Sequence, residues 1–320
     1  MKLKLWCISI VMLLCASTAF VLQAQDVTHS QDPVMASPDL VRFYSSEWEG
    51  PRMNDGRPLV EAELLERLKN IKVEDVWQFL NEAGYRNQFE GGWKMLHTDR
   101  PMTGQAMTAQ FMPARADVRD RMVQMGHEAG HIGPMNSWPI DQLQQGDIYV
   151  ADAFGKIAQG TLIGDKLGNS IFARSKNGVI FDASLRDAET LRRIDGFNAF
   201  TRGWHPTFLQ DVMLTGINVP VRIGQVTVMP GDVILAKEIG VVFIPPHLVE
   251  VIVITSEIVG IRDEFVHQRV GEGVYTPGQV DARWTQAIED DFRQWLEDGR
   301  MHRLPVPYEQ MHRYLEHRTW

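Results

Sequence analysis

The pattern of apolar and polar residues predicts which parts of the chain form helices and which form strands. Between Val60 and Leu80 the apolar residues recur at helical spacing and are interrupted near Asn70, which predicts two short helices. Residues 105–112 alternate as in a strand, and residues 116–124 return to helical spacing. We therefore expect the first part of the chain to pack helices against a strand.

The middle of the chain reads as a strand, a helix and a second strand. Residues 147–151 form a short apolar run, a helical stripe begins at Gly164, and residues 178–182 have the composition of a buried strand. This order is a βαβ unit, whose connection is almost always right-handed. It predicts two parallel strands in one sheet.

Four short strands and two helices are predicted in the last third of the chain. Turn residues separate the strands, which favours a β-rich layer, and the strands cover residues 219–223, 225–228, 232–236 and 241–244. Helical spacing covers residues 247–269 and 279–296, and the second helix carries Trp284, Ile288, Phe292 and Trp295 on one face. We expect that face to be buried against the domain or against another subunit. The fold class is therefore α/β.

The first 24 residues have the order of a secretory signal peptide: two lysines, an apolar run over residues 5–22, and the small residue Ala24 at the expected cleavage point. A membrane anchor kept at the N-terminus is the alternative. We expect the mature protein to begin near Gln25 with a polar lead-in over residues 25–57. It would then be periplasmic or secreted, with no attachment to the membrane.

Composition and charge narrow the functional classes. Cys7 and Cys15 are the two cysteines of the chain and lie in the signal segment, so the processed protein would have no disulfide and no cysteine nucleophile. The formal net charge is -9 and no block of basic residues occurs, which argues against nucleic acid as a partner. The 320 residues, 44% of them hydrophobic, describe one large globular domain or one domain with appended ends.

The strongest candidate chemistry lies near the predicted βαβ unit. A helix that starts at residue 164 presents unpaired N–H groups, which favour an anion such as a carboxylate. Arg186 and Asp187 follow the second strand of the unit, at the sheet edge where ligands gather in open α/β folds. Arginine offers a planar fork to a carboxylate and aspartate a hard oxygen to magnesium or manganese, so the pair could hold an α-keto acid and its metal. The alternative is a surface ion pair in which Asp187 caps a helix.

These motifs, in this order, resemble the core of the RraA-like family, the fold of the metal-dependent 4-hydroxy-4-methyl-2-oxoglutarate aldolases. The resemblance covers roughly residues 60–255, and it is carried by residues 146–152, 164–167, 178–187, 200–203, 230–236 and 240–245. It implies an RraA-like β/β/α swivelling-type domain over residues 58–255, followed by a C-terminal helical extension over residues 256–320. It also implies a homotrimer with active sites at the subunit interfaces.

The resemblance further implies roles for individual residues. Arg186 would grip the carboxylate of a keto-acid substrate, and Asp187 would hold a divalent metal, magnesium or manganese, partly through waters. Backbone amides of the substrate loop would also contact the substrate; this loop is Gly164, Asp165, Lys166 and Leu167. The implied activity is that of a class II aldolase that cleaves a 4-hydroxy-2-oxo dicarboxylate to pyruvate or decarboxylates oxaloacetate. The branch that gives the family its name inhibits ribonuclease E, a cytoplasmic partner that an exported chain would not meet.

Two positions depart from the family pattern, which is a glycine, twenty residues, Arg-Asp, two residues and an acid. Asp165 stands at the glycine position and Thr190 at the acid position, while Gly164 and Glu189 each come one place early. One place is a turn of about 100° on a helix, so Glu189 does not simply replace the missing acid. A non-catalytic RraA-like protein that binds a small carboxylate is therefore the alternative function.

A different metal site is suggested by His127-Glu128-Ala129-Gly130-His131, which matches the H-E-x-x-H pattern of zinc metallopeptidases. The glycines around this motif make a poor helix, and the alternative is a pair of exposed histidines at a helix end.

Lys166 is the candidate for a class I aldolase, which needs a buried lysine for a Schiff base. We favour instead a solvated lysine at a helix start or an additional contact to the substrate carboxylate.

Overall fold

The computed structural model describes residues 32–315. The predicted signal peptide and both cysteines lie outside the described residues. Within residues 32–315, no helix has the length and apolar character that a membrane crossing requires.

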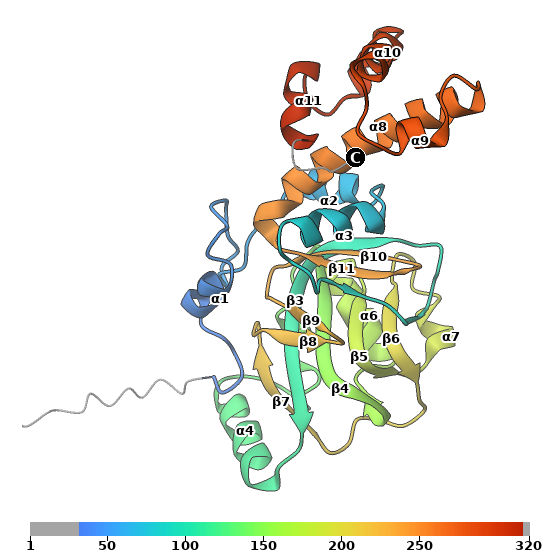
Figure 1. The fold of residues 1–320 in the computed structure, drawn as a ribbon. Helices are drawn as coiled ribbons and strands as arrows, with labels where there is room; N and C mark the ends of the chain where they lie inside the picture. The colour runs from blue at the N-terminus through green and yellow to red at the C-terminus, as the bar shows by residue number, and fades with distance from the viewer. Residues whose placement is uncertain (1–31, 316–320) are drawn as a thin grey trace, which may run out of the picture.

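A nine-stranded mixed sheet forms the centre of the molecule (Figure 1). Its order is β1-β11-β10-β3-β4-β5-β6-β2, and β7 pairs with β3 off this path. The strands of this sheet are β1 Phe89–Glu90, β2 Lys94–Met95, β3 Met102–Pro113, β4 Asp147–Thr161, β5 Val179–Leu185, β6 Ala199–Trp204, β7 Val212–Ile217, β10 Val233–Lys237 and β11 Gly240–Ile244. Strands β3 to β6 run parallel to one another, which confirms the parallel pair predicted from the βαβ pattern.

Eleven α-helices are described in this part of the chain. They are α1 Pro38–Tyr44, α2 Ala62–Leu68, α3 Val73–Glu82, α4 Ala116–Glu128, α5 Trp138–Asp141, α6 Asp165–Ser175, α7 Ala188–Leu191, α8 Val249–Gly271, α9 Pro277–Val280, α10 Gln286–Glu297 and α11 Tyr308–Leu315, with 3-10 turns at Pro246–Leu248 and Met301–Arg303. The two helices predicted around Asn70 are α2 and α3. The α/β fold class is confirmed.

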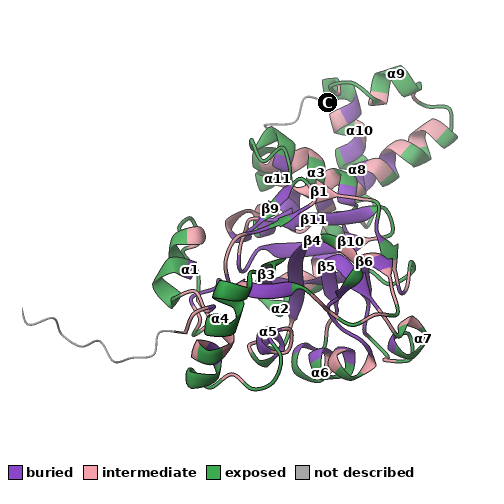
Figure 2. Cartoon of the chain, turned by 90° about the horizontal axis from the view of Figure 1, so that it is seen from below, coloured by how far each residue is buried: buried purple, intermediate pink, exposed green. Residues whose placement is uncertain are grey.

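The sheet is covered on both faces, which gives three layers. Phe181 of β5 points to the face covered by α5 and α6, where its ring meets Tyr149 edge-on at 4.9 Å. Ile180 points to the opposite face, which is covered by a two-stranded hairpin of β8 Val221–Ile223 and β9 Val226–Val228. Figure 2 shows that the central strands are largely buried, and their buried apolar residues face both sides of the sheet.

The C-terminal helices differ from the prediction. Residues 279–296 were expected to form one helix, but α9 ends at Val280 and α10 begins after Thr285, whose extended backbone starts a new helix. The aromatic face is buried all the same, because Trp284, Phe292 and Trp295 surround Phe265 of α8 with ring centres 5.3 to 5.8 Å away. This face is therefore covered within the chain and is not left for another subunit.

The described part of the predicted lead-in packs on the domain. Val34 and Val41 are buried, and the guanidinium group of Arg57 donates hydrogen bonds of 2.7 and 3.0 Å to the two carboxylate oxygens of Asp147. Neither side chain of this pair is exposed to solvent, and Asp55 contacts Arg57 from the other side at 2.7 Å. A buried ion pair thus fastens residues 32–57 to the start of β4. The domain limits at residues 58 and 255 remain predictions.

Candidate functional site

The substrate loop and the Arg186–Asp187 pair lie side by side at the carboxyl ends of β4 and β5. The backbone N–H of Arg186 donates to the carbonyl oxygen of Ile163 at 3.3 Å. The backbone N–H of Asp165 donates to Oδ2 of Asp187 at 3.1 Å. Two segments that are 22 residues apart in the sequence therefore meet where α6 and α7 begin, and the structure brings the predicted site residues together.

Asp187 holds an unusual backbone conformation, with φ 57° and ψ 35°. A residue with a side chain adopts this left-handed region at a cost of about 1 kcal/mol, and such outliers cluster at functional sites. The Asp187 side chain makes no capping hydrogen bond to α7, although the residue occupies the N-cap position. Its carboxylate turns towards the start of α6 instead, so the helix-cap interpretation does not account for it.

Gly164 lies against both side chains of the pair. A Cβ atom at this position would overlap Oδ2 of Asp187 and would lie 2.8 Å from Nε of Arg186. The Nε atom of Arg186 is itself 3.5 Å from that Asp187 oxygen. The close approach that requires glycine therefore falls on residue 164, one place before the position at which the family pattern has its glycine.

We expect Gly164→Ala to reduce activity without unfolding the protein. The backbone of Gly164 is extended, with φ -127°, so alanine can adopt it and the effect comes from the displaced Asp187 and Arg186 side chains. A displacement of this kind lowers turnover by about 10- to 100-fold. The pyruvate release that the family resemblance implies would be measured together with thermal unfolding. Gly260→Ala is the matched control, because nothing lies within 4 Å of a Cβ there. Equal activity of the two variants would contradict the proposed role of Gly164.

The remaining loop residues differ in their surroundings. Leu167 is half-buried and packs against the main core, whereas Lys166 is exposed on the first turn of α6. A lysine that forms a Schiff base is activated by burial or by a neighbouring cation. The exposure of Lys166 argues against that chemistry and leaves it free to meet a carboxylate.

The structure also places Thr190, the departure at the acid position of the family pattern, and its neighbour Glu189. Glu189 and Thr190 are exposed on α7, and the backbone N–H of Thr190 donates to the carbonyl oxygen of Asp187 at 3.0 Å. The hydroxyl of Thr190 cannot supply the negative charge that an acid would bring to this position.

A divalent metal fits these residues only if it keeps water ligands. The Asp187 side chain is 38% exposed, and Oδ1 of the neighbouring Asp165 accepts the N–H of Lys166 at 2.8 Å. Between residues 32 and 315, no three His, Cys, Asp or Glu side chains gather closely enough to enclose a metal ion. Magnesium commonly binds through one or two carboxylates and retains several waters, so Asp187 suits such an ion and a closed zinc cage is not formed.

The His127–His131 motif does not have the helical geometry that a zinc peptidase needs. Helix α4 ends at Glu128, and Gly130 has φ 102°, so His131 lies beyond the helix. The ring of His131 stacks on Trp138 at 4.6 Å, and its Nε2 is 2.8 Å from Oδ2 of Asp32. The two histidines therefore do not share a helix face, and the zinc-peptidase interpretation is wrong for this arrangement.

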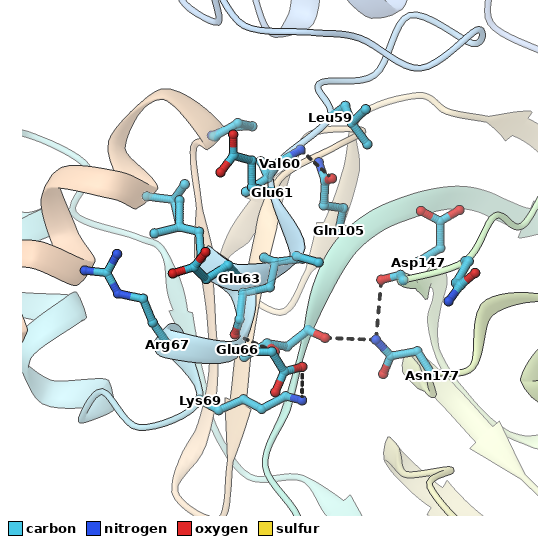
Figure 3. A pocket seen from close by; sticks show the side chains of 18 of the residues that line it. Leu59, Val60, Glu61, Glu63, Glu66, Arg67, Lys69, Gln105, Asp147 and Asn177 are labelled. Carbon is cyan, nitrogen blue, oxygen red and sulfur yellow. Dashed lines mark hydrogen bonds and ion pairs between the residues drawn. The ribbon is translucent and has the colours of Figure 1, made fainter.

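A large cavity lies away from the Arg186–Asp187 pair. Its volume is about 960 Å³, and its walls include Glu63 of α2, Thr103 at the start of β3 and Asn177 just before β5. Figure 3 shows the acidic side chains of α2 on one wall and Asn177 on the other. These residues mark the amino ends of the parallel strands, opposite the edge that carries Arg186 and Asp187.

No sequence pattern predicts this cavity, because its walls come from segments that are far apart along the chain. We place the candidate site at Arg186 and Asp187 nevertheless. A guanidinium group, a carboxylate and the N–H groups of a helix converge there, whereas the cavity walls mix acidic and basic side chains.

Known proteins are similar to the part of the chain that contains the candidate site. The family model described as RraA-like, Aldolase/RraA, matches residues 62–243. Protein DlpA of Legionella pneumophila is 25% identical over 222 residues, which are 66% of this chain and 32% of DlpA. A Hahella chejuensis protein, named provisionally as a 4-hydroxy-4-methyl-2-oxoglutarate aldolase, is 30% identical over 110 residues, which are 34% of this chain and 65% of that protein. The chain therefore covers less than two thirds of either relative.

The fold of this chain is similar to that of proteins whose structures have been solved. Streptomyces coelicolor RraAS2, described as an unusual member of the RNase ES inhibitor RraA protein family, matches with a TM-score of 0.56 at 26% identity. The match covers 66% of this chain and 100% of that one. An uncharacterized protein from Pseudomonas syringae pv. tomato matches with a TM-score of 0.56 at 20% identity, over 70% of this chain and 99% of that one, which is a likeness of fold alone.

Proposed function

Because this chain belongs to the RraA-like family, Aldolase/RraA, we propose that it is a metal-dependent carbon–carbon lyase that releases pyruvate from a 4-hydroxy-2-oxo dicarboxylate. Oxaloacetate decarboxylation would use the same site. The observation that carries this proposal is the hydrogen bond from the Asp165 N–H to Asp187, which holds the carboxylate beside the amino end of α6. The name of the Hahella chejuensis relative supports the substrate class.

The residues of this chain would bind and orient the keto acid. The Arg186 fork would hold its carboxylate, because a guanidinium group favours an anion. The site lies beside the start of α6, where the N–H of Asp165 donates to Asp187 and the N–H of Lys166 donates to Asp165. Lys166 would meet the second carboxylate of a longer substrate. A magnesium or manganese ion held by Asp187, partly through waters, would act as a Lewis acid for the negative charge that develops on the 2-oxo oxygen.

Bond cleavage then requires the loss of one proton and the gain of another. A base takes the proton of the 4-hydroxyl group, the bond between C3 and C4 breaks, and protonation of C3 completes pyruvate. The side chains of Arg186 and Asp187 are 41% and 38% exposed in the single chain, so the site is open to water. We propose that a homotrimer covers it, and that the protein acts outside the cytoplasm.

The second candidate function is a protein that binds a small carboxylate without turnover. The observation that favours it is the exposed Thr190 at the position of the family's acid. Calorimetric titration with pyruvate, combined with a turnover assay on 4-hydroxy-2-oxo dicarboxylates and oxaloacetate, distinguishes the two functions, because a binding protein would take up pyruvate and yet cleave none of these keto acids.

We expect purified protein to release pyruvate from some member of a panel of 4-hydroxy-2-oxo dicarboxylates and oxaloacetate. Chelation should abolish this release, magnesium or manganese should restore it, and borohydride should trap no adduct, because Lys166 is exposed. The double variant His127→Ala, His131→Ala is the control and should retain turnover, since neither histidine lies at the site. Release that survives chelation and is blocked by borohydride would contradict the metal-dependent mechanism.

A further inference from the structure

A second, smaller cavity lies between the N-terminal segment and the ends of β9 and β11. Its volume is about 270 Å³, which is small beside the range of about 300–1,000 Å³ that is usual for drug-sized ligands. Its walls include the aromatic residues Tyr44, Trp48 and Tyr85, the acidic residues Glu47 and Asp232, and His247, together with neutral residues. None of these residues belongs to the candidate site at Arg186 and Asp187.

Asp232 is the unusual member of this cavity. It is 4% exposed, and its Oδ2 accepts the backbone N–H of Met229 at 2.8 Å. Over the described range 32–315, no hydrogen bond or ion pair reaches its other oxygen, Oδ1. Burial raises the pKa of Asp232 to about 7, and only the hydrogen bond from Met229 opposes that rise.

Of the three other aspartates that are buried in the described residues, two have a cation beside them, while Asp152 accepts hydrogen bonds from the side-chain amide of Gln110 and the backbone N–H of Phe154. Asp147 is paired with Arg57, and Asp182 accepts a 2.7 Å hydrogen bond from Nε of Arg202. Asp232 has no arginine or lysine among the residues that line its cavity. A buried carboxylate without a cation lowers stability, and proteins keep such groups chiefly where they serve a function.

The rest of the wall suits a positive charge as well. Tyr44, Trp48 and Tyr85 contribute aromatic rings, whose faces attract ammonium groups. The basic group on the wall is His247, and burial lowers its pKa, so the ring is neutral at pH 7. The ring of His247 also lies 3.4 Å from the hydroxyl of Tyr85, which holds that side of the cavity together.

We propose that this cavity binds a small organic cation of the ammonium class, with Asp232 as its counter-ion and the rings of Tyr44, Trp48 and Tyr85 as its walls. The carboxylate supplies charge and the rings supply the apolar contact that an alkylated ammonium group needs. This site is independent of the proposed lyase activity, because it shares no residue with the substrate loop or with Arg186 and Asp187.

Calorimetric titration of the full chain with choline tests the proposal. Choline should bind at least about tenfold more tightly than 3,3-dimethyl-1-butanol, its uncharged isostere, because ring faces and a carboxylate favour the charge. Binding should strengthen as the pH rises through 7, because the ionised form of Asp232 pairs with the cation. Glu47 and His247 are the other acidic and basic groups on this wall, so the pH series is repeated with Glu47→Gln.

The variant Asp232→Asn keeps an oxygen that can accept the N–H of Met229 but removes the negative charge. It should weaken choline binding by about tenfold and remove the pH dependence of that binding. Glu66→Gln is the control, since Glu66 lines the neighbouring large cavity, and it should bind choline normally. If Asp232→Asn does not fold, Tyr85→Leu at the cavity mouth should weaken choline binding severalfold and leave its pH dependence. Equal binding of choline and its isostere, or no binding of choline, would overturn the proposal.

Discussion

Asp187→Asn is expected to lower metal-dependent pyruvate release by about 100-fold, because removing one preorganised charged group from a site typically costs two to three orders of magnitude. Asparagine keeps the oxygen that accepts the Asp165 N–H, and it also tolerates the left-handed backbone at φ 57°. The variant therefore removes the charge that would hold the metal and keeps the conformation. Turnover measured across a magnesium titration would show the loss, with unchanged thermal unfolding.

The variant Arg186→Lys tests whether the site needs only the positive charge of Arg186 or also the planar geometry of its guanidinium group. Lysine keeps the positive charge but lacks the planar fork, so KM should rise by about tenfold while kcat falls less. Arg193→Ala is the matched control, since Arg193 is exposed and lies one turn beyond the pair. Full activity of both Asp187→Asn and Arg186→Lys would refute the assignment of the site.

The second large effect concerns stability. Arg57→Ala is expected to lower the free energy of unfolding by about 3–5 kcal/mol, because it leaves the carboxylate of Asp147 buried without a cation. The loss should grow as the pH rises: without Arg57 the pKa of Asp147 in the folded state lies still further above its unfolded value, so stability is retained at low pH and lost as Asp147 ionises. Urea unfolding at several pH values would measure this.

Two further variants control that experiment. Arg42→Ala breaks the exposed pair with Asp39 and should cost less than about 1 kcal/mol. The double variant Arg57→Ala, Asp147→Asn removes both charges, and its loss should be smaller than the sum of the losses measured for Arg57→Ala and Asp147→Asn alone. A loss for Arg57→Ala no larger than that for Arg42→Ala would show that the ion pair does not fasten the N-terminal segment.

Local signals in the sequence predicted the elements that carry the candidate site. The glycine before α6, the apolar run of β5 and the Arg-Asp pair after it are all short-range features, and each one appears where its spacing placed it. The length of β4 could not be predicted, because the segment after Asp152 looks like a glycine-rich loop. In the structure this segment continues the strand through register shifts to Thr161, with Phe154 and Gln159 at positive φ.

Features that depend on distant segments were not predictable. Arg57 and Asp147 are 90 residues apart in the sequence, and no pattern around either residue predicts that the two form an ion pair. The cavity around Asp232 likewise joins residues near positions 45, 85, 230 and 246. Such arrangements depend on the order of strands in the sheet, which periodicity along the chain does not encode.

Helix α8 belongs to two packing units at once. Ile252 and Val253 in its first half are buried with α2, α3 and the sheet, while Ile261 and Phe265 in its second half are buried with the C-terminal helices. The predicted domain limit at residue 255 falls inside this continuous helix. Residues 256–315 therefore pack around the second half of the same helix whose first half covers the sheet. A protein truncated at residue 255 would lose most of helix α8, whereas proteolytic cleavage in the loop after Gly271 would leave the helix intact.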